Sequence, residues 1–493
     1  MKSPHMHTRS STRCVLAWVT LLALACAFAF ASCAGSSSPS GGGKKKEQVI
    51  LSSPEVDVKV GREEAKKVGG AMGLLDDSAL VAYVNEIGQR LARHAPRRRF
   101  SYEFQIVDQD APNAFALPGG FIYVSRGLLI LSNSETELAN VIGHEIIHVA
   151  ARHAAARQSV VGALGPLAAF AAGSIASYSR DQERESDRLG QGLAALAGYN
   201  PDGLALFLRD LEYTERLRLG GSRLPGFFDT HPATTERVAS ASARSRVVEW
   251  TPKPPIAENH SDYLRRLDGL VVGTSAAEGV FDGDRFLHAD LDFTIRFPSG
   301  WKTMNTRQAV GAFSPRRDAQ VYLEHQGPGT DPQLASQKFI QKAEKDGVRL
   351  KIEKVQPLKI GPYPAYRIQG RIVMRGGSGA VMMTWVARDG GIYCITAAGS
   401  PPAFNRYKGS FLSVARSFRP MPPDYRRNIR ENRLRIVPAK AGESLSTLGR
   451  RTENQWDIQT TAVMNGIFAD ARLEAGQLIK IAVSRAYTPV AAQ

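Results

Sequence analysis

The sequence predicts an α+β protein with several domains. Its 493 residues are enough for about three domains of ordinary size. Helical spacing of apolar residues predicts a buried helix around residue 144, and alternating strands begin near residue 281. The predicted organisation is a signal peptide (1–32), a lipidated cysteine with a flexible linker (33–48), a mainly helical domain with a small sheet (49–250), a linker (251–280), an α+β domain (281–421) and a small βααβ module (432–493).

The N-terminus is predicted to be a targeting segment. A basic start precedes the apolar run "CVLAWVTLLALACAFAF", and a Gly/Ser-rich stretch follows it. This is the layout of a secretory signal peptide with a flexible linker behind it. The stretch "FASC" resembles a bacterial lipobox, which predicts that Cys33 becomes the lipidated first residue of the mature chain. An uncleaved membrane anchor is the alternative, and both interpretations place the rest of the chain outside the cytoplasm.

Cysteine content and charge narrow the classes of site and partner. After Cys33 the sequence contains only Cys394, so no disulfide forms without Cys33 and no cysteine cluster binds a metal. The net charge is +16, and the triplet Lys44 to Lys46 lies beside the predicted anchor, where cations suit an anionic surface. The cluster Arg97 to Arg99 lacks interleaved aromatic residues and is interpreted as a solvated loop. We therefore expect membrane or cell-wall partners and no nucleic acid.

The segment "VIGHEIIHVAARH" (141–153) places polar residues inside an apolar helix. Ser134 and Glu137 have the spacing of a capping box, which predicts the start of this helix. His144 and His148 are four residues apart and share one face, which is the separation at which two imidazoles bind one Zn²⁺. Glu145 lies beside them, where it can reach a metal-bound water. The alternative is a pair of hydrogen-bonded core histidines.

A second segment, "YSRDQERESDRLG", offers acidic candidates for a third ligand. It predicts a helix that starts at Ser179, with Glu183 and Asp187 on one face. Acidic residues are also common at a helix start, because they interact favourably with the positive end of the helix dipole. This segment alone therefore does not distinguish a metal ligand from a stabilised helix end. His153 follows His144 by nine residues, about 180° around a continuing helix, and is expected to face away as a packing or surface residue.

Four segments together resemble one known family. In order, "NAFALPGGFIYVSRGLL", "ELANVIGHEIIHVAARH", "YSRDQERESDRLG" and "THPATTER" are similar to the signatures of the CAAX prenyl protease and HtpX-type zinc metallopeptidases, within their soluble periplasmic BepA/LoiP-like branch. The resemblance covers about residues 50 to 245 and implies a zincin protease domain. It implies one Zn²⁺ per chain, bound by His144, His148 and Glu183, with Asp187 behind the ligands.

The same resemblance implies the catalytic roles. Glu145 would act as the general base, and His231 and Arg237 would line the site and help to stabilise the transition state. His231 could instead occupy the fourth zinc position at rest, and the sequence does not separate these roles. An edge strand that aligns extended substrates by backbone pairing is expected at Asn113, Ala114 and Phe115. Backbone pairing depends little on the side chains of the substrate, which suits a protease that degrades misfolded or misassembled envelope proteins.

Two further regions are assigned from their patterns. The apolar stretch 159–178 is expected to be a helical lid or core element and not a membrane span, because Pro166 and several glycines interrupt it. The domain at 281–421 is similar to PsbP-like domains, and it contains no clustered set of histidines and acids. Its expected role is substrate or partner binding, with Trp385 and Tyr393 in its core.

The last 60 residues resemble a degenerate LysM module, with Asn465 in its loop and Gly476 before its last strand. This implies binding of peptidoglycan through residues 432–493. Ala34 follows Cys33, so lipidation would send the chain to the outer membrane, with the protease in the periplasm. The alternative function is a non-catalytic envelope chaperone or wall-binding adaptor with a structural metal. Glu145 favours the enzyme, because a structural zinc needs no base beside it.

Overall fold

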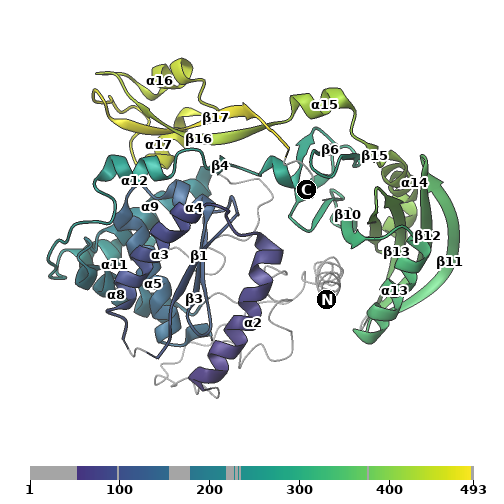
Figure 1. Cartoon of the computed structure of the whole chain (residues 1–493), viewed down its shortest axis with the longest axis horizontal. Coiled ribbons are helices and arrows are strands. Elements are labelled where there is room, and N and C mark those ends of the chain that lie inside the picture. The colour runs from purple at the N-terminus through teal and green to yellow at the C-terminus, as the bar shows by residue number, and fades with distance from the viewer. Residues whose placement is uncertain are drawn as a thin grey trace, which may run out of the picture.

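The structure is a computed structural model that describes residues 53–96, 99–154, 178–217, 227, 231, 235–374 and 377–489. Figure 1 shows a mainly helical N-terminal domain, a β-rich domain beside it, and a C-terminal module that lies along one side of the N-terminal domain. The predicted signal peptide, Cys33 and its linker lie outside the described residues, as does all of the apolar stretch except Tyr178. Among the described helices, none is both long enough and apolar enough to cross a membrane.

The N-terminal domain packs its helices around a three-stranded sheet with the order β1-β3-β2. Strand β3 pairs in parallel with β1 and antiparallel with β2, so β2 lies at an edge of this sheet. The elements are α2 (Pro54–Met72), α3 (Ser78–Ala92), β1 (Glu103–Val107), β2 (Ala114–Leu117), β3 (Phe121–Ser125), α4 (Arg126–Leu131), α5 (Glu135–Ala150), α8 (Arg180–Ala197), α9 (Gly203–Leu217) and α11 (Thr235–Ser245).

Helix α5 lies in the middle of this domain and is buried on all sides. The backbone N–H of Glu137 donates to the Ser134 hydroxyl at 3.1 Å, which confirms the predicted helix start. Helix α8 begins with the predicted capping box of Ser179 and Gln182. The two helices approach closely at glycines, because a Cβ on Gly190 would lie only 2.8 Å from the backbone nitrogen of His144. This contact places the acidic face of α8 against the histidines of α5.

Residues 251–280 differ from the expected linker, because their first part, up to Val272, completes the N-terminal domain, whereas Ala276 is buried with residues of the β-rich domain. They form α12 (His260–Arg266) and β4 (Val271–Val272), followed by the short 3₁₀ helix η1 (Ala276–Glu278). Tyr263, Leu264 and Leu267 are buried in the same hydrophobic core as α5. The prolines near residue 254 suggested a domain boundary, but the apolar spacing that follows them belongs to a packed helix.

The β-rich domain has two sheets and two helices. A seven-stranded sheet has the order β11-β12-β13-β14-β10-β9-β8, and a four-stranded sheet has the order β15-β7-β6-β5. Helices α13 and α14 contribute to separate cores on the two faces of the larger sheet. Trp385 and Tyr393 are buried there, as predicted. The elements are β5 (Val280–Asp282), β6 (Arg285–His288), β7 (Phe293–Arg296), β8 (Lys302–Asn305), β9 (Ala309–Phe313), β10 (Ala319–Pro328), α13 (Pro332–Lys345), β11 (Arg349–Ile360), β12 (Tyr363–Met374), β13 (Gly377–Arg388), β14 (Gly391–Gly399), α14 (Pro401–Ser417) and β15 (Arg419–Pro420).

The C-terminal module follows α15 (Pro423–Asn428) and has the element order β16 (Arg430–Pro438), α16 (Leu445–Thr452), α17 (Ile458–Met464) and β17 (Leu478–Ala486). This is the predicted βααβ order, but the module is not separate from the N-terminal domain. Strand β16 pairs with both β17 and β4. Leu434 and Met464 are buried in the core that contains α5. The β-rich domain is therefore inserted between β4 and β16, two neighbouring strands of one sheet.

Candidate metal centre

Four buried side chains from three parts of the N-terminal domain meet beside α5. His144 and His148 come from α5, Glu183 comes from the first turn of α8, and His231 precedes α11. Each offers one ligand atom, and these four atoms lie within 4.8 Å of one another. All four side chains are almost completely buried. Such a group of polar atoms inside a protein core needs a common partner, and a metal ion is the partner that three imidazoles and a carboxylate suit.

The distances fit ligands around one small cation. The Nε2 atoms of His144 and His148 lie 2.9 Å apart, and Nδ1 of His231 lies 3.2 Å from Nε2 of His144. Oε1 of Glu183 lies 2.9 Å from Nδ1 of His231 and 3.4 Å from Nε2 of His148. Neighbouring ligands of a tetrahedral zinc site lie about 3.3 Å apart, given metal–ligand distances of about 2.0–2.1 Å. The donor set therefore fits Zn²⁺.

An ion pair behind the ligands fixes the orientation of His144. Nδ1 of His144 lies 3.0 Å from Oδ1 of Asp187, so the proton on Nδ1 points at the carboxylate and the Nε2 lone pair points at the metal position. Arg237 donates to both oxygens of Asp187, at 2.8 Å and 2.7 Å. The third nitrogen of Arg237 lies 2.7 Å from Oε2 of Glu183. All three guanidinium nitrogens thus engage carboxylates, so Arg237 lines the site from behind the ligands, and its expected part in stabilising the transition state stays a prediction.

The protonation of these groups favours metal binding. Burial alone raises the pKa of Glu183, but the charge of His231 and hydrogen bonds from His148 and His231 outweigh it, so the pKa of Glu183 lies below its ordinary value. Burial also opposes ionisation of Asp187, yet hydrogen bonds from His144 and Arg237 lower its pKa. Burial lowers the pKa of His148 well below that of a free imidazole. The site therefore presents carboxylates and a neutral imidazole, which are the forms that bind metal.

Two aromatic rings that the sequence did not suggest pack against the ligands. Tyr178 stacks on His148 with ring centroids 3.8 Å apart, and Phe227 stacks on His231 at 4.3 Å. The backbone also ties Phe227 into place, because its N–H donates to Pro112 at 2.9 Å and its carbonyl accepts from His231 at 2.7 Å. The only available signal was sequence proximity, since Tyr178 immediately precedes the α8 cap and Phe227 precedes His231 by four residues.

His153 lies differently from its expected position. Helix α5 ends at Ala150, and Arg152 adopts a left-handed conformation with φ of 57°. The chain therefore turns back, and Nδ1 of His153 lies 3.0 Å from Nδ1 of His148. His153 is buried behind the ligand, on the side of the His148 ring that faces away from the four-residue cluster. The assumption of a continuing helix was wrong, although His153 is not a member of the cluster.

The expected substrate strand is β2, which runs beside the cluster. Ala114 and Phe115 pair with Val124 and Tyr123 of β3. The N–H of Asn113 donates to the Ser125 hydroxyl at 2.8 Å, which fixes the start of the strand. Asn113, Ala114 and Phe115 are all buried, so the start of this edge is covered in the structure.

Comparisons with known proteins agree with this geometry. Residues 78–245 match the model of peptidase family M48. The Beta-barrel assembly-enhancing protease of Escherichia coli K12 is 30% identical over 233 residues, which are 42% of this chain and 46% of that protein. The Mitochondrial metalloendopeptidase OMA1 of Schizosaccharomyces pombe is 26% identical over 196 residues, which are 36% of this chain and 56% of that protein. The chain thus spans about half the length of these curated relatives.

Among solved structures, cyanobacterial PsbP from Synechocystis aligns with 30% of this chain and 98% of its own chain. The sequence identity is 12% and the TM-score is 0.25. A score this low does not establish a PsbP-like fold for the β-rich domain.

Proposed function

Residues 78–245 belong to peptidase family M48, and we propose from this that the chain is a zinc-dependent endopeptidase of the bacterial cell envelope. The observation that best supports this proposal is the buried group of His144, His148, Glu183 and His231. Glu145 directly follows His144 in the sequence. Oε1 of Glu145 lies 3.4 Å from Nε2 of His231, so the carboxylate is at the edge of the metal position. A purely structural zinc would not need this acid.

The proposed reaction assigns separate tasks to the side chains. When bound, zinc supplies a Lewis acid that lowers the pKa of water to about 7 and polarises a carbonyl. Glu145 accepts the proton of the attacking water and passes it to the leaving amine. Asp187 keeps His144 in the tautomer that binds metal, and Arg237 holds the carboxylates of Glu183 and Asp187 in place. Strand β2 pairs with an extended substrate through its backbone.

His231 is proposed to be the fourth zinc ligand at rest. Its Nδ1 atom lies within 3.2 Å of both His144 and Glu183, which is ligand spacing. A hydrolytic zinc site keeps one position open for water, so His231 must leave before a substrate is cleaved. Once displaced, its imidazole would line the site and make a smaller contribution to stabilising the oxyanion, which reconciles the two roles that the sequence left open.

The substrates and location follow from the N-terminal segment and the relatives. We assign misfolded or misassembled envelope proteins as substrates, and the name of the bacterial relative, an assembly-enhancing protease, supports this class. Lipidation of Cys33 would tether the chain to the outer membrane with the protease in the periplasm. Replacement of Cys33 by serine should release the protein from the outer-membrane fraction. Retention of the Cys33→Ser protein after a high-salt wash would contradict the lipoprotein anchor.

Residues 432–493 are proposed to bind peptidoglycan. An exposed aromatic side chain supports this role, because Phe468 is 82% exposed on the loop between α17 and β17. Aromatic residues, phenylalanine included, are enriched at the cores of binding interfaces. Phe468→Ala should reduce retention of the purified chain on insoluble peptidoglycan, whereas Leu334→Ala, an exposed change in the β-rich domain, should not. Equal retention of the two variants would argue against this surface.

The central test is metal analysis and digestion of casein by the purified chain, with and without a chelator. The proposal predicts about one zinc per chain, cleavage of casein, loss of cleavage on chelation and recovery on adding Zn²⁺. A protein that holds zinc but never cleaves unfolded substrate would favour the adaptor or chaperone alternative.

A further inference from the structure

The C-terminal module inserts one lysine into the N-terminal domain. Lys480 lies on β17 and is completely buried. Its Nζ donates to the carbonyls of Ile130 at 2.7 Å, Ser132 at 3.1 Å and Leu131 at 3.3 Å. These carbonyls form the C-terminal end of α4, where the helix dipole favours a cation. Fully buried lysines are rare without such partners, so this contact is a specific attachment point.

Two carboxylates offset the positive charge of this lysine. The charged groups around Lys480 are Glu137 on α5, Asp210 with its partner Arg209 on α9, and His260 on α12. Asn133 connects the two carboxylates, since its backbone N–H donates to Glu137 at 2.7 Å and its side chain donates to Asp210 at 3.0 Å. Burial lowers the pKa of Lys480 to about 7 and raises that of Glu137 to about 7, so neither charge is stable there without the other.

The module holds the lysine rigidly. Asn465 accepts from the backbone N–H of Lys480 at 2.7 Å and donates to its carbonyl at 2.9 Å. Gly466 follows in a left-handed conformation, and a Cβ there would lie 3.1 Å from the Asp210 carboxylate. The loop that carries Asn465 and Gly466 therefore rests directly on the charged cluster.

This attachment lies on the helix that carries the zinc ligands. Glu137 precedes His144 by seven residues, which places it on the same stripe of α5, about 10 Å along the axis. Helix α9 makes a second connection, because Phe207 packs edge-to-face against Phe227, which stacks on His231. A shift at Lys480 therefore reaches the metal centre through two packed elements.

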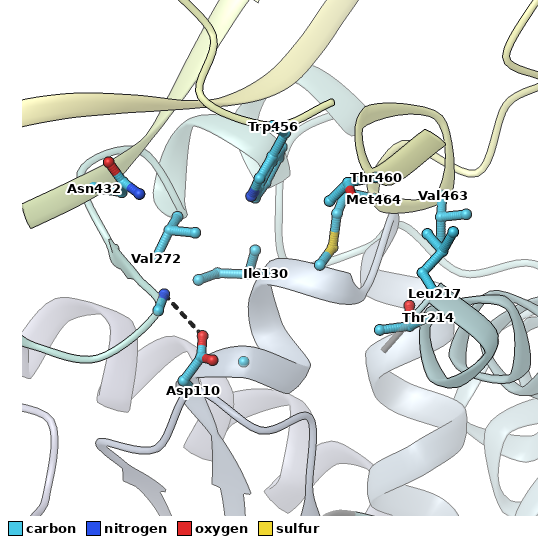
Figure 2. A pocket seen from close by; sticks show the side chains of 12 residues that line it. Asp110, Ile130, Thr214, Leu217, Val272, Asn432, Trp456, Thr460, Val463 and Met464 are labelled. Atoms are coloured by element: carbon cyan, nitrogen blue, oxygen red, sulfur yellow. Dashed lines mark hydrogen bonds between the residues drawn. The ribbon is translucent and has the colours of Figure 1, made fainter. Parts of the chain in front are cut away.

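The rest of the interface combines buried apolar contacts with an open pocket, because Leu434 and Met464 lie in the core of the N-terminal domain. A cavity of about 310 Å³ lies between the module and the N-terminal domain, beside the lysine. Figure 2 shows Trp456 and Met464 of the module on one side and Asp110 and Ile130 of the N-terminal domain on the other. The lysine, the pairing of β16 with β4 and the buried side chains of Leu434 and Met464 therefore hold the module against the N-terminal domain beside this pocket.

We propose that residues 430–486 are a docked regulatory element, and that Lys480 is the latch through which docking holds the zinc-binding helix in its metal-retaining position. The inference rests on the proposed zinc site but not on proteolysis. Undocking would leave Glu137 and Asp210 buried without their cation and the end of α4 without its donor. The start of α5 would then loosen, and the zinc ligands would hold the ion less firmly.

The test compares Lys480→Met with Lys440→Met in the full chain. Both changes remove a lysine charge from the module, but Lys440 is exposed. Lys480→Met should increase acrylamide quenching of Trp456, which is half-buried in the structure, with Trp456→Phe as the fluorescence background. It should also accelerate zinc transfer to a chelator by about tenfold, the lower end of the effect of residues behind metal ligands. Lys440→Met should match the parent chain in both measurements.

A second variant keeps the test decisive if Lys480→Met folds poorly. Glu137→Gln combined with Lys480→Met removes the lysine and one of its two carboxylates, so it should melt at a higher temperature than Lys480→Met and still release zinc faster than the parent. The proposal is overturned if Trp456 stays protected in the Lys480 variants. It is equally overturned if Trp456 becomes accessible while zinc release is unchanged. Neither readout uses proteolysis, so a chain that never cleaves casein would leave this result standing.

Discussion

Glu145 and His231 are in direct contact beside the metal position, with Oε1 of the glutamate 3.4 Å from Nε2 of the histidine, whose Nδ1 lies among the ligand atoms. One residue is the proposed base, and the other is the group that must leave before the base can act. In the proposed mechanism His231 closes the resting site and Glu145 activates the water, so removal of each residue should have an opposite effect on proteolysis.

Glu145→Gln should retain about one zinc per chain and lose casein cleavage by several orders of magnitude. The amide fills the same space but cannot accept the proton of the attacking water. Metal analysis and an initial-rate assay on the same sample check both parts. Undiminished cleavage by this variant would falsify the proposed mechanism.

His231→Ala should retain zinc near one per chain, because His144, His148 and Glu183 remain. The rate of casein cleavage should rise several-fold, since the fourth position is open without a displacement step. A fall in rate with zinc still bound would instead assign His231 a dominant role in stabilising the transition state.

Glu183→Ala should lower the zinc content sharply, because it removes a ligand and leaves Arg237 without one of its partners. His153→Ala should leave the content near one, with faster release to a chelator, because His153 only supports the ring of His148. Metal analysis after gel filtration separates the two outcomes. An empty site in the His153 variant would mean that this residue is itself a ligand.

The β-rich domain should lose stability in mild acid through His288. Burial, with a smaller contribution from His325, lowers the pKa of His288 from 6.5 to about 4. Neutral Nδ1 also accepts the N–H of Leu291 at 3.3 Å. The unfolded chain binds a proton first as the pH falls, so this stability is complete above pH 6.5 and is lost on the way to pH 4, up to about 3 kcal/mol. His288→Asn keeps an acceptor without titrating and should flatten the dependence of denaturant unfolding on pH. An unchanged slope would contradict this assignment.

The sequence predicted the parts of the site that depend on local spacing. His144 and His148 are one turn apart, and Glu183 and Asp187 are one turn apart, so a helix alone brings each pair together. His231 came from the family resemblance, because no local pattern links it to α5. His153 was placed wrongly because the end of α5 depends on a single left-handed residue, Arg152.

Other contacts depend on the folded arrangement and leave no local signal. Lys480 reads as an ordinary residue of an alternating strand, and its partner Ile130 is 350 positions away. Residues 251–280 read as a linker because prolines precede them, whereas Tyr263 packs under α5. Interfaces between distant segments are set by shape and charge that a one-dimensional pattern does not contain.

The insertion of the β-rich domain between β4 and β16 sets the order in which the molecule can mature. The N-terminal domain contains the whole cluster, yet the partner strand of β4 and the lysine at the end of α4 follow the inserted domain in the sequence. Pairings between such distant segments form late, because the chain between them must first be ordered. A chain still emerging from a ribosome or an export channel therefore has a catalytic helix with an unfinished support. In the proposed mechanism, protease competence would arrive only after β16 and β17 are made, which would delay peptide cleavage until the inserted domain has been synthesised.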